Sequence, residues 1–189
     1  MSTKDEIIDA AVKLFTDYGY HKATMDLIAE EVGVAKGTIY WYFSSKKELF
    51  MEILKVDFHR YFDFLQELRD NNQLNSQEKM ETIIVNRMDH FEKHKPIFRE
   101  LMTNNEEIDK EFKEEMMGLR DKHAQLLADL FSQGIENGEF EIEDSYIAAL
   151  AFMGINISIS NDNLLTNQEN KERTARILKD FIFNGIMKK

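Results

Sequence analysis

The chain has 189 residues, of which 43% are hydrophobic and 31% charged, a composition that is ordinary for a soluble globular protein of one or two domains. It holds no cysteine, which excludes disulfides, thiolate zinc sites and cysteine nucleophiles within these residues. Its net charge of −11 argues against attraction of the whole surface to nucleic acid or anionic membranes, but leaves room for a local patch.

No stretch of the chain predicts membrane insertion. The first residues, MSTKDEIIDA, lack the apolar segment of a signal peptide, and the longest weakly polar run, residues 148–159, is too short to span a bilayer. Because cysteine is absent as well, we expect a cytoplasmic protein with no membrane partner.

One proline and eight glycines are few for this length, so we expect an all-α fold. The first helix is predicted over residues 3–18, because Thr3 and Glu6 have the spacing of a capping box and apolar residues follow at helical intervals. Gly19 is expected to end this helix in a left-handed conformation.

Two short helices follow, and their spacing predicts a helix-turn-helix. The first begins after Thr24, a good N-cap, and the second begins at Lys36, directly after a tight turn. Gly33 can adopt the positive φ that the turn requires, and Ala29 is small enough for close helix crossing. The inner face is expected to be apolar and consists of Ile28, Val32, Val34 and Ile39.

The segment VGVAKGTIYWYFSSKK, residues 32–47, contains no acidic residue in a strongly acidic chain. If Ile39 faces inward, the helical rotation of about 100° per residue turns Tyr40 and Trp41 toward solvent. Such a face does not repel phosphate, and hydroxyl, phenol and indole groups can reach base edges in the major groove. Phe43, one turn after Ile39, is expected in the core, and Tyr42 is expected to be partly buried.

The remainder of the chain is also predicted to be helical. Ser76 is a candidate N-cap, and Pro96 suits a first helical position. With the first three helices, about nine are expected; the later ones lie at about residues 46–69, 76–95, 96–104, 108–136, 143–160 and 168–187.

The helix-turn-helix region resembles a known family. TMDLIAEEVGVAKGTIYWYFSSKKELF, together with KLFTDYGYHKAT, is similar to the TetR family of bacterial transcriptional repressors over about residues 7–50. The rest matches only in the number, order and length of its helices. The resemblance implies a three-helix DNA-binding domain at residues 1–47 and a helical ligand-sensing and dimerisation domain at residues 48–189.

The resemblance also implies partners: double-stranded operator DNA with two half-sites, a second copy of the chain, and a small-molecule effector. No cofactor is implied. With the face of the second short helix, it predicts these DNA-contacting residues: Thr24, Lys36, Gly37, Thr38, Tyr40, Trp41, Tyr42 and Lys46.

Two features depart from the family pattern. Ala35 stands where a capping serine is common, which costs the second helix about 1 kcal/mol. Asp26, Glu30 and Glu31 keep the region acidic, so we expect strong salt dependence and modest non-specific affinity for DNA.

Residues 51–189 hold eight of the ten methionines and eleven of the fourteen phenylalanines. Most are expected to form a helical core, but some are predicted to line an apolar cavity for a hydrophobic or amphipathic ligand. The candidates for this cavity are Phe58, Phe62, Met88, Phe91, Met102, Phe112, Met116, Phe152 and Met153.

The last two helices are candidates for a dimer interface, because small residues on one and an apolar stripe on the other could form a four-helix bundle with a second copy. Packing within a single chain is the alternative. The predicted interface residues are Ala148, Ala151, Leu178, Phe181, Ile182 and Ile186.

No catalytic or metal-binding arrangement is predicted. His90 and His94 have helical spacing, but Glu92 does not follow the first histidine as in zinc proteases. No phosphate-binding glycine loop or nucleophile elbow occurs.

The sequence therefore predicts a DNA-binding transcriptional repressor that a small inducer releases from its operator. Two alternatives stay open: a helical co-regulator that binds a protein instead of DNA, and an all-helical enzyme, which the lack of catalytic motifs disfavours.

Overall fold

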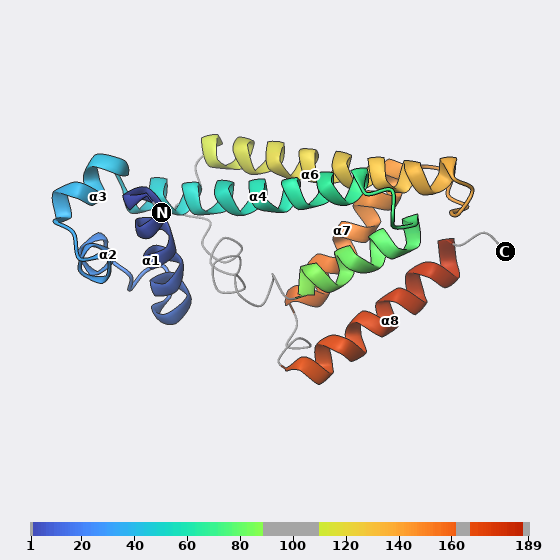
Figure 1. Ribbon diagram of the computed structural model, residues 1–189. Coiled ribbons are helices and arrows are strands. Elements are labelled where there is room, and N and C mark those ends of the chain that lie inside the picture. Colours follow the sequence, from blue (N-terminus) through green and yellow to red (C-terminus); the bar gives the residue numbers. More distant parts are fainter. Residues whose placement is uncertain (1, 89–109, 162–166, 187–189) are drawn as a thin grey trace. The chain divides into compact units, whose positions relative to one another are not determined.

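The computed structural model describes residues 2–88, 110–161 and 167–186, and it confirms the all-α fold in these ranges (Figure 1). A further helix covers residues 76–88, between α4 and α6 in the chain. The predicted helix at about 96–104 lies outside the described residues. The labelled helices are α1 (Thr3–Tyr18), α2 (Met25–Val32), α3 (Lys36–Tyr42), α4 (Lys46–Asp70), α6 (Lys110–Glu136), α7 (Ser145–Asn161) and α8 (Gln168–Ile186).

The chain divides into two compact units. The N-terminal unit comprises Met1–Arg60 with Lys93–Lys113, and the C-terminal unit comprises Tyr61–Glu92 with Glu114–Lys189. Helix α4 contributes residues to both units. The predicted division at residues 47 and 48 stays a prediction.

The start of α1 is shifted from the prediction. The capping box is formed by Ser2 and Asp5: the Asp5 amide donates to Ser2 Oγ at 3.3 Å, and the Ser2 amide donates to Asp5 Oδ2 at 2.9 Å. The prediction of Thr3 and Glu6 is therefore wrong by one residue, because both pairs have the same spacing. Gly19 ends α1 with a φ of 82°, although its ψ of 158° lies outside the left-handed helical region.

The core of the N-terminal unit contains an aromatic cluster. The rings of Phe15, Tyr20 and Phe50 lie with centroids 5.0 to 5.8 Å apart, mostly edge to face. Ile7 and Ile28 are fully buried in the same unit. This packing joins the end of α1, the following loop and the start of α4.

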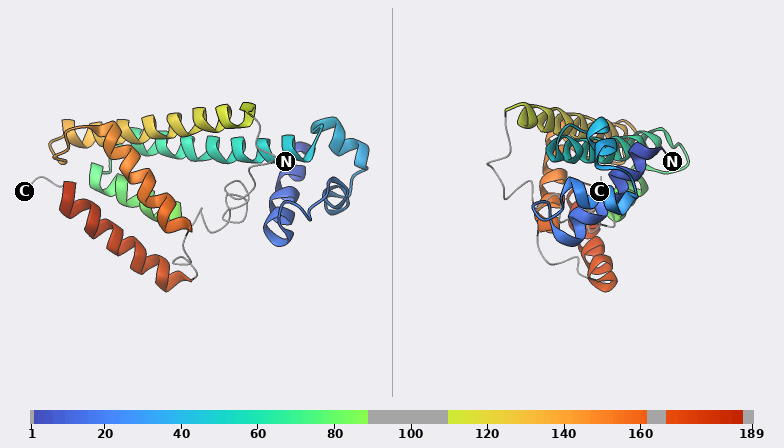
Figure 2. Two further views of the ribbon diagram at one scale, coloured as in Figure 1. Left: turned by 180° about the vertical axis from the view of Figure 1, so that it is seen from behind. Right: turned by 90° about the vertical axis from the view of Figure 1, so that its left-hand side faces the viewer.

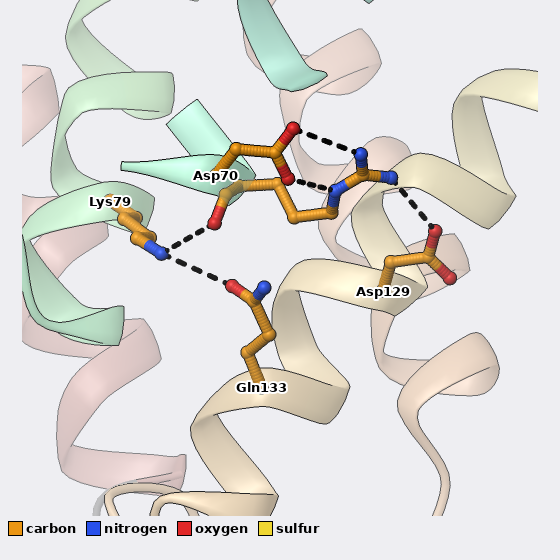
Figure 3. A network of polar contacts seen from close by, with 5 residues as sticks. Asp70, Lys79, Asp129 and Gln133 are labelled. Carbon is orange, nitrogen blue, oxygen red and sulfur yellow. Dashed lines mark hydrogen bonds and ion pairs between the residues drawn. The ribbon is translucent and has the colours of Figure 1, made fainter. Parts of the chain in front are cut away.

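A network of polar contacts around the buried Lys79 links helices of the C-terminal unit (Figure 3). The buried Lys79 donates from Nζ to the Arg69 carbonyl at 2.8 Å and to Gln133 Oε1 at 3.1 Å. Arg69 also pairs with Asp70 at 2.8 Å and with Asp129 at 3.8 Å. These contacts join the end of α4, the helix of residues 76–88, and α6; Figures 1 and 2 show the end of α4 beside α6.

The N-terminus of the helix of residues 76–88 also corrects a prediction. Asn75 is the N-cap, because its Oδ1 accepts from the Glu78 amide at 2.8 Å and Glu78 Oε2 accepts from the Asn75 amide at 2.9 Å. The predicted cap, Ser76, is buried, and its amide donates to Glu139 Oε2 at 2.7 Å. That distant contact cannot be inferred from local spacing.

Candidate DNA-binding surface and sensing unit

The turn between α2 and α3 has the geometry that the sequence predicts. Gly33 adopts φ 75° and ψ 29°, in the left-handed region, and the Val34 amide donates to the Ala29 carbonyl at 3.0 Å. A Cβ at Gly33 would meet no atom within 4 Å, so the backbone angle alone requires glycine. Ile39 is fully buried, and these contacts define a helix-turn-helix.

The outer face of α3 carries large exposed aromatic side chains. Trp41 is 78% exposed and Tyr40 is 44% exposed, as the sequence predicts. Tyr42 is half-buried and packs edge to face against Trp41, with centroids 4.6 Å apart. Packing within the chain does not account for so exposed a tryptophan, which suits a contact surface instead.

The N-terminus of α3 lacks a side-chain cap, which confirms the prediction for Ala35. Gly37 is exposed, with no atom within 4 Å of the position of a Cβ, and Thr38 is half-buried. The first turn of α3 is thus open around Gly37.

Lys36 forms an ion pair with Asp26, which links the starts of α3 and α2. Its side chain is 58% exposed, and that of Asp26 is 62% exposed. The hydrogen bond that Lys36 donates to the Asp26 carboxylate raises the pKa of the Lys36 ammonium group. An exposed pair of this kind contributes little stability, so a phosphate can compete with Asp26 for Lys36.

Lys46 has a structural contact that the sequence did not reveal. Its Nζ donates to the Tyr20 carbonyl at 2.8 Å and lies 4.3 Å from the centroid of the Tyr20 ring. Lys46 therefore ties the start of α4 to the loop after α1. The contact joins residues 26 positions apart, so only the folded chain shows it.

An open depression of about 420 Å³ gathers half of the predicted DNA-contacting residues. It also contains Ser44 and Ser45, which precede α4 and which sequence reasoning missed, although two adjacent serines before a lysine pair are a recognisable polar signal. The lining residues are Thr24, Met25, Asp26, Lys36, Tyr40, Ser44, Ser45 and Lys46.

The predicted cavity residues do not all lie in one unit. Phe62, Met88, Phe152 and Met153 are buried in the C-terminal unit, where Met116 is half-buried.

Phe58 and Phe112 belong to the N-terminal unit, whereas Phe91 and Met102 lie outside the described residues. Whether any of the predicted side chains lines a cavity stays a prediction.

A groove of about 650 Å³ lies in the C-terminal unit between the helix of residues 76–88 and α8. An ion pair of 2.8 Å between Lys179 and Glu81 crosses it. The hydrogen bond from Lys179 lowers the pKa of the Glu81 carboxyl. None of its lining residues was predicted; they are Gln77, Glu81, Val85, Glu172, Ala175, Arg176, Lys179, Asp180, Phe183 and Asn184.

His123 on α6 is an unusual buried polar residue that sequence reasoning missed. It is 5% exposed, and its Nε2 has no hydrogen-bond partner in the part of the chain that the structure describes. Burial, followed by the positive charge of Arg87, lowers the pKa of His123 to about 3. An unpaired buried polar atom costs about 1–3 kcal/mol, so this position needs an explanation.

The predicted dimer residues have different environments. Phe181 is 69% exposed, Ala151 is exposed and Ala148 is half-buried. Leu178 and Ile182 are buried within the chain itself, which leaves little of their side-chain area for a partner.

Two apolar side chains that were not predicted, Ile147 on α7 and Ile177 on α8, are more than half exposed. The side chain of Ile186 is not among those that the structure describes. Dimerisation itself stays a prediction.

Within the described ranges, no helix has the length and apolar character needed to cross a bilayer. No cluster of three or more potential metal ligands occurs among the same residues, and His90 and His94 lie outside them.

The fold and the α2–α3 surface together define a helix-turn-helix transcriptional regulator. Two family models match the chain: "Bacterial regulatory proteins, tetR family" over residues 7–53, and "Tetracyclin repressor-like, C-terminal domain" over residues 73–161. Together they cover more than half of the chain, which belongs to the TetR family. The predicted family is thus confirmed.

Individual relatives extend this comparison. The negative transcriptional regulator IcaR of the icaADBC biofilm operon, from Staphylococcus epidermidis, is 35% identical over 69 residues, which are 36% of this chain and 37% of that protein. The fatty acid degradation regulator FadR from Bacillus halodurans has the same fold, with a TM-score of 0.82 at 21% identity, over 98% of this chain and 96% of that one.

FadR from Bacillus subtilis, solved in complex with stearoyl-CoA, has a TM-score of 0.77 at 20% identity, over 94% of this chain and 96% of that one.

Proposed function

We propose that the protein is a transcriptional repressor that binds operator DNA through α3 and leaves it when a small amphipathic molecule binds the C-terminal unit. One observation carries the proposal: Trp41, on a face of α3 without acidic residues, is 78% exposed. An indole so exposed beside Tyr40 and Lys36 fits a surface that contacts base edges and phosphates.

Helix α4 offers a physical connection between the two activities. It is continuous from Lys46 to Asp70 and contributes to both compact units. We expect a ligand in the C-terminal unit to change the orientation of α4 and hence the spacing of two recognition helices in a dimer. Operator half-sites require a spacing of roughly 34 Å or a multiple of it, so another spacing would lower DNA affinity.

Dimerisation through α7 and α8 belongs to the same proposal. The exposed Phe181, Ile177 and Ile147 supply apolar area that a second copy could cover. Phe181→Glu is expected to give a monomer in sedimentation experiments and to weaken operator binding, because two half-sites would no longer be bound together. A dimeric variant with normal operator affinity would remove Phe181 from the interface.

Two observations support an amphipathic effector. The C-terminal unit is rich in buried phenylalanine and methionine, which can surround an apolar group. The similar fold of FadR from Bacillus subtilis contains stearoyl-CoA, which is a finding about that protein.

The direct test uses the single tryptophan, Trp41, as a reporter. Purified protein is titrated with fragments of the DNA that flanks its own gene, at low and at moderate salt, and band shifts and fluorescence are followed. We expect a saturable change for one fragment that weakens steeply as salt rises. An unchanged emission and no shifted band at low salt would reject DNA binding.

That negative outcome would favour the alternative of a co-regulator that binds a protein. The observation behind this alternative is Asp26, an acid that lies in the α2–α3 depression and pairs with Lys36. Affinity purification with wild-type protein and Trp41→Ala would then identify a partner that depends on α3.

A further inference from the structure

The C-terminal unit contains a polar group whose partner is missing. His123 Nε2 is buried and makes no hydrogen bond with any residue that the structure describes. Buried polar atoms in folded proteins are almost always paired with protein, water or a ligand. No cluster of three or more potential metal ligands occurs in the described ranges.

Two aromatic residues of α4 surround the histidine ring. The Tyr61 ring packs edge to face against it, with centroids 5.1 Å apart and planes at 82°. The Phe62 ring centroid is 6.5 Å away. Both side chains are buried, so the histidine lies beside apolar surface rather than in a polar channel.

A cation lies next to the same tyrosine. The Arg87 guanidinium carbon is 5.2 Å from the Tyr61 ring centroid, which places Arg87 and His123 around one ring. Among the described residues no carboxylate pairs with Arg87. The helix of residues 76–88 therefore brings to the site a positive charge that no described carboxylate pairs with.

The chemistry of this cluster selects the charge of a ligand. The low pKa of His123 keeps its ring neutral at neutral pH, so the imidazole supplies a hydrogen bond and not a charge. Arg87 provides the positive charge, and its guanidinium group can form a bidentate pair with a carboxylate. A cationic ligand would meet repulsion here and would find no acid in the cluster.

We propose that His123 Nε2 and Arg87 bind the anionic head group of the effector, while Tyr61 and Phe62 pack against its apolar chain. This inference rests on the proposed function, because it identifies the chemical class of the molecule that the C-terminal unit senses. It assigns a fatty carboxylate, with the Nε2 proton donated to one carboxylate oxygen.

The experiment uses full-length protein, with dodecanoate as the probe and dodecanol as a probe of equal length without charge. Binding of both is measured by calorimetry for wild type, His123→Phe, Arg87→Gln and the control Arg120→Gln, which changes an exposed arginine of α6. We expect wild type and the control to bind dodecanoate at least tenfold more tightly than either site variant. We expect Arg87→Gln to leave dodecanol binding unchanged.

A readout without ligand separates binding from a structural role. His123→Phe removes the unpaired nitrogen and keeps a ring, so the free variant is expected to melt at the same or a higher temperature than wild type. A clear fall in its melting temperature would show that Nε2 has a partner within the chain, and would overturn the inference. Equal affinities of wild type for dodecanoate and dodecanol, or no binding of either, would also overturn it.

DNA binding distinguishes failure of this inference from failure of the proposed function. Both site variants should bind operator DNA like wild type, but dodecanoate should release only wild type and the control. If no variant binds DNA while dodecanoate binding depends on His123 and Arg87, the repressor proposal fails and the carboxylate site stands. If DNA binds and dodecanoate has no effect on any variant, the carboxylate site fails alone.

Discussion

The two units of the chain position their candidate functional side chains in opposite ways. In the N-terminal unit Trp41 is exposed, on a helix that the neighbouring Gly33 turn and the buried Ile39 orient. In the C-terminal unit His123 is buried, and its neighbours Tyr61 and Arg87 come from two other helices. The position of the exposed Trp41 thus depends on short-range spacing in the sequence, whereas the cluster around the buried His123 depends on long-range packing.

The largest expected effect tests whether the α3 surface depends on its core. Ile39→Ala removes a fully buried side chain and is expected to lower the free energy of unfolding by about 2–5 kcal/mol. Chemical denaturation measures the change, and operator binding should fall with it because α3 loses its anchor. A variant with wild-type stability would show that α3 is held by other contacts.

The Trp41→Ala variant distinguishes a role of Trp41 in DNA binding from a role in core packing. Because Trp41 is 78% exposed, the variant should unfold within about 0.5 kcal/mol of wild type. Operator affinity, measured by band shift at fixed salt, should fall about tenfold to a hundredfold if the indole contacts bases. If stability fell while operator affinity stayed unchanged, Trp41 would be a packing residue and not a DNA contact.

The start of α3 has no side-chain cap, so adding one is expected to raise the stability of the protein. Ala35→Ser supplies a side-chain acceptor for the first turn and is expected to raise the free energy of unfolding by about 1 kcal/mol. Ala35→Val, which cannot accept a hydrogen bond, is the matched control. If serine and valine gave equal stabilities, a missing cap would not limit this helix.

A smaller effect tests the long-range contacts of the C-terminal unit. Lys179, 98 residues after Glu81, lowers the pKa of the Glu81 carboxyl. A folded-state pKa below the unfolded one stabilises the protein above about pH 4.5, and this stabilisation is lost as pH falls through the folded pKa.

Glu81→Gln should therefore cost a few tenths to about 1 kcal/mol at pH 7, and the cost should shrink toward pH 3. Urea denaturation at several pH values measures it, with the exposed Glu141→Gln as control. A cost that does not change with pH would mean that the charge of Glu81 contributes nothing.

Much of the fold and of the DNA-binding surface follows from the sequence by itself. Gly33, Ala29 and Ile39 occupy positions whose spacing leaves one arrangement of α2 and α3, and this spacing turns Trp41 outward. Helix boundaries are also nearly local properties: α4 was predicted to end at Arg69 and ends at Asp70. The physical reason is that turns, caps and helical periodicity involve residues only a few positions apart.

Only the tertiary structure decided which residues of the C-terminal unit meet. Leu178 and Ile182 share the apolar stripe of Phe181 in the sequence, yet the folded chain buries the first two and exposes the third. The approach of Arg87 and His123 to one tyrosine ring likewise depends on how three helices pack. Helical periodicity identifies an apolar face, but it does not specify which neighbour covers that face or which buried polar atom remains unpaired.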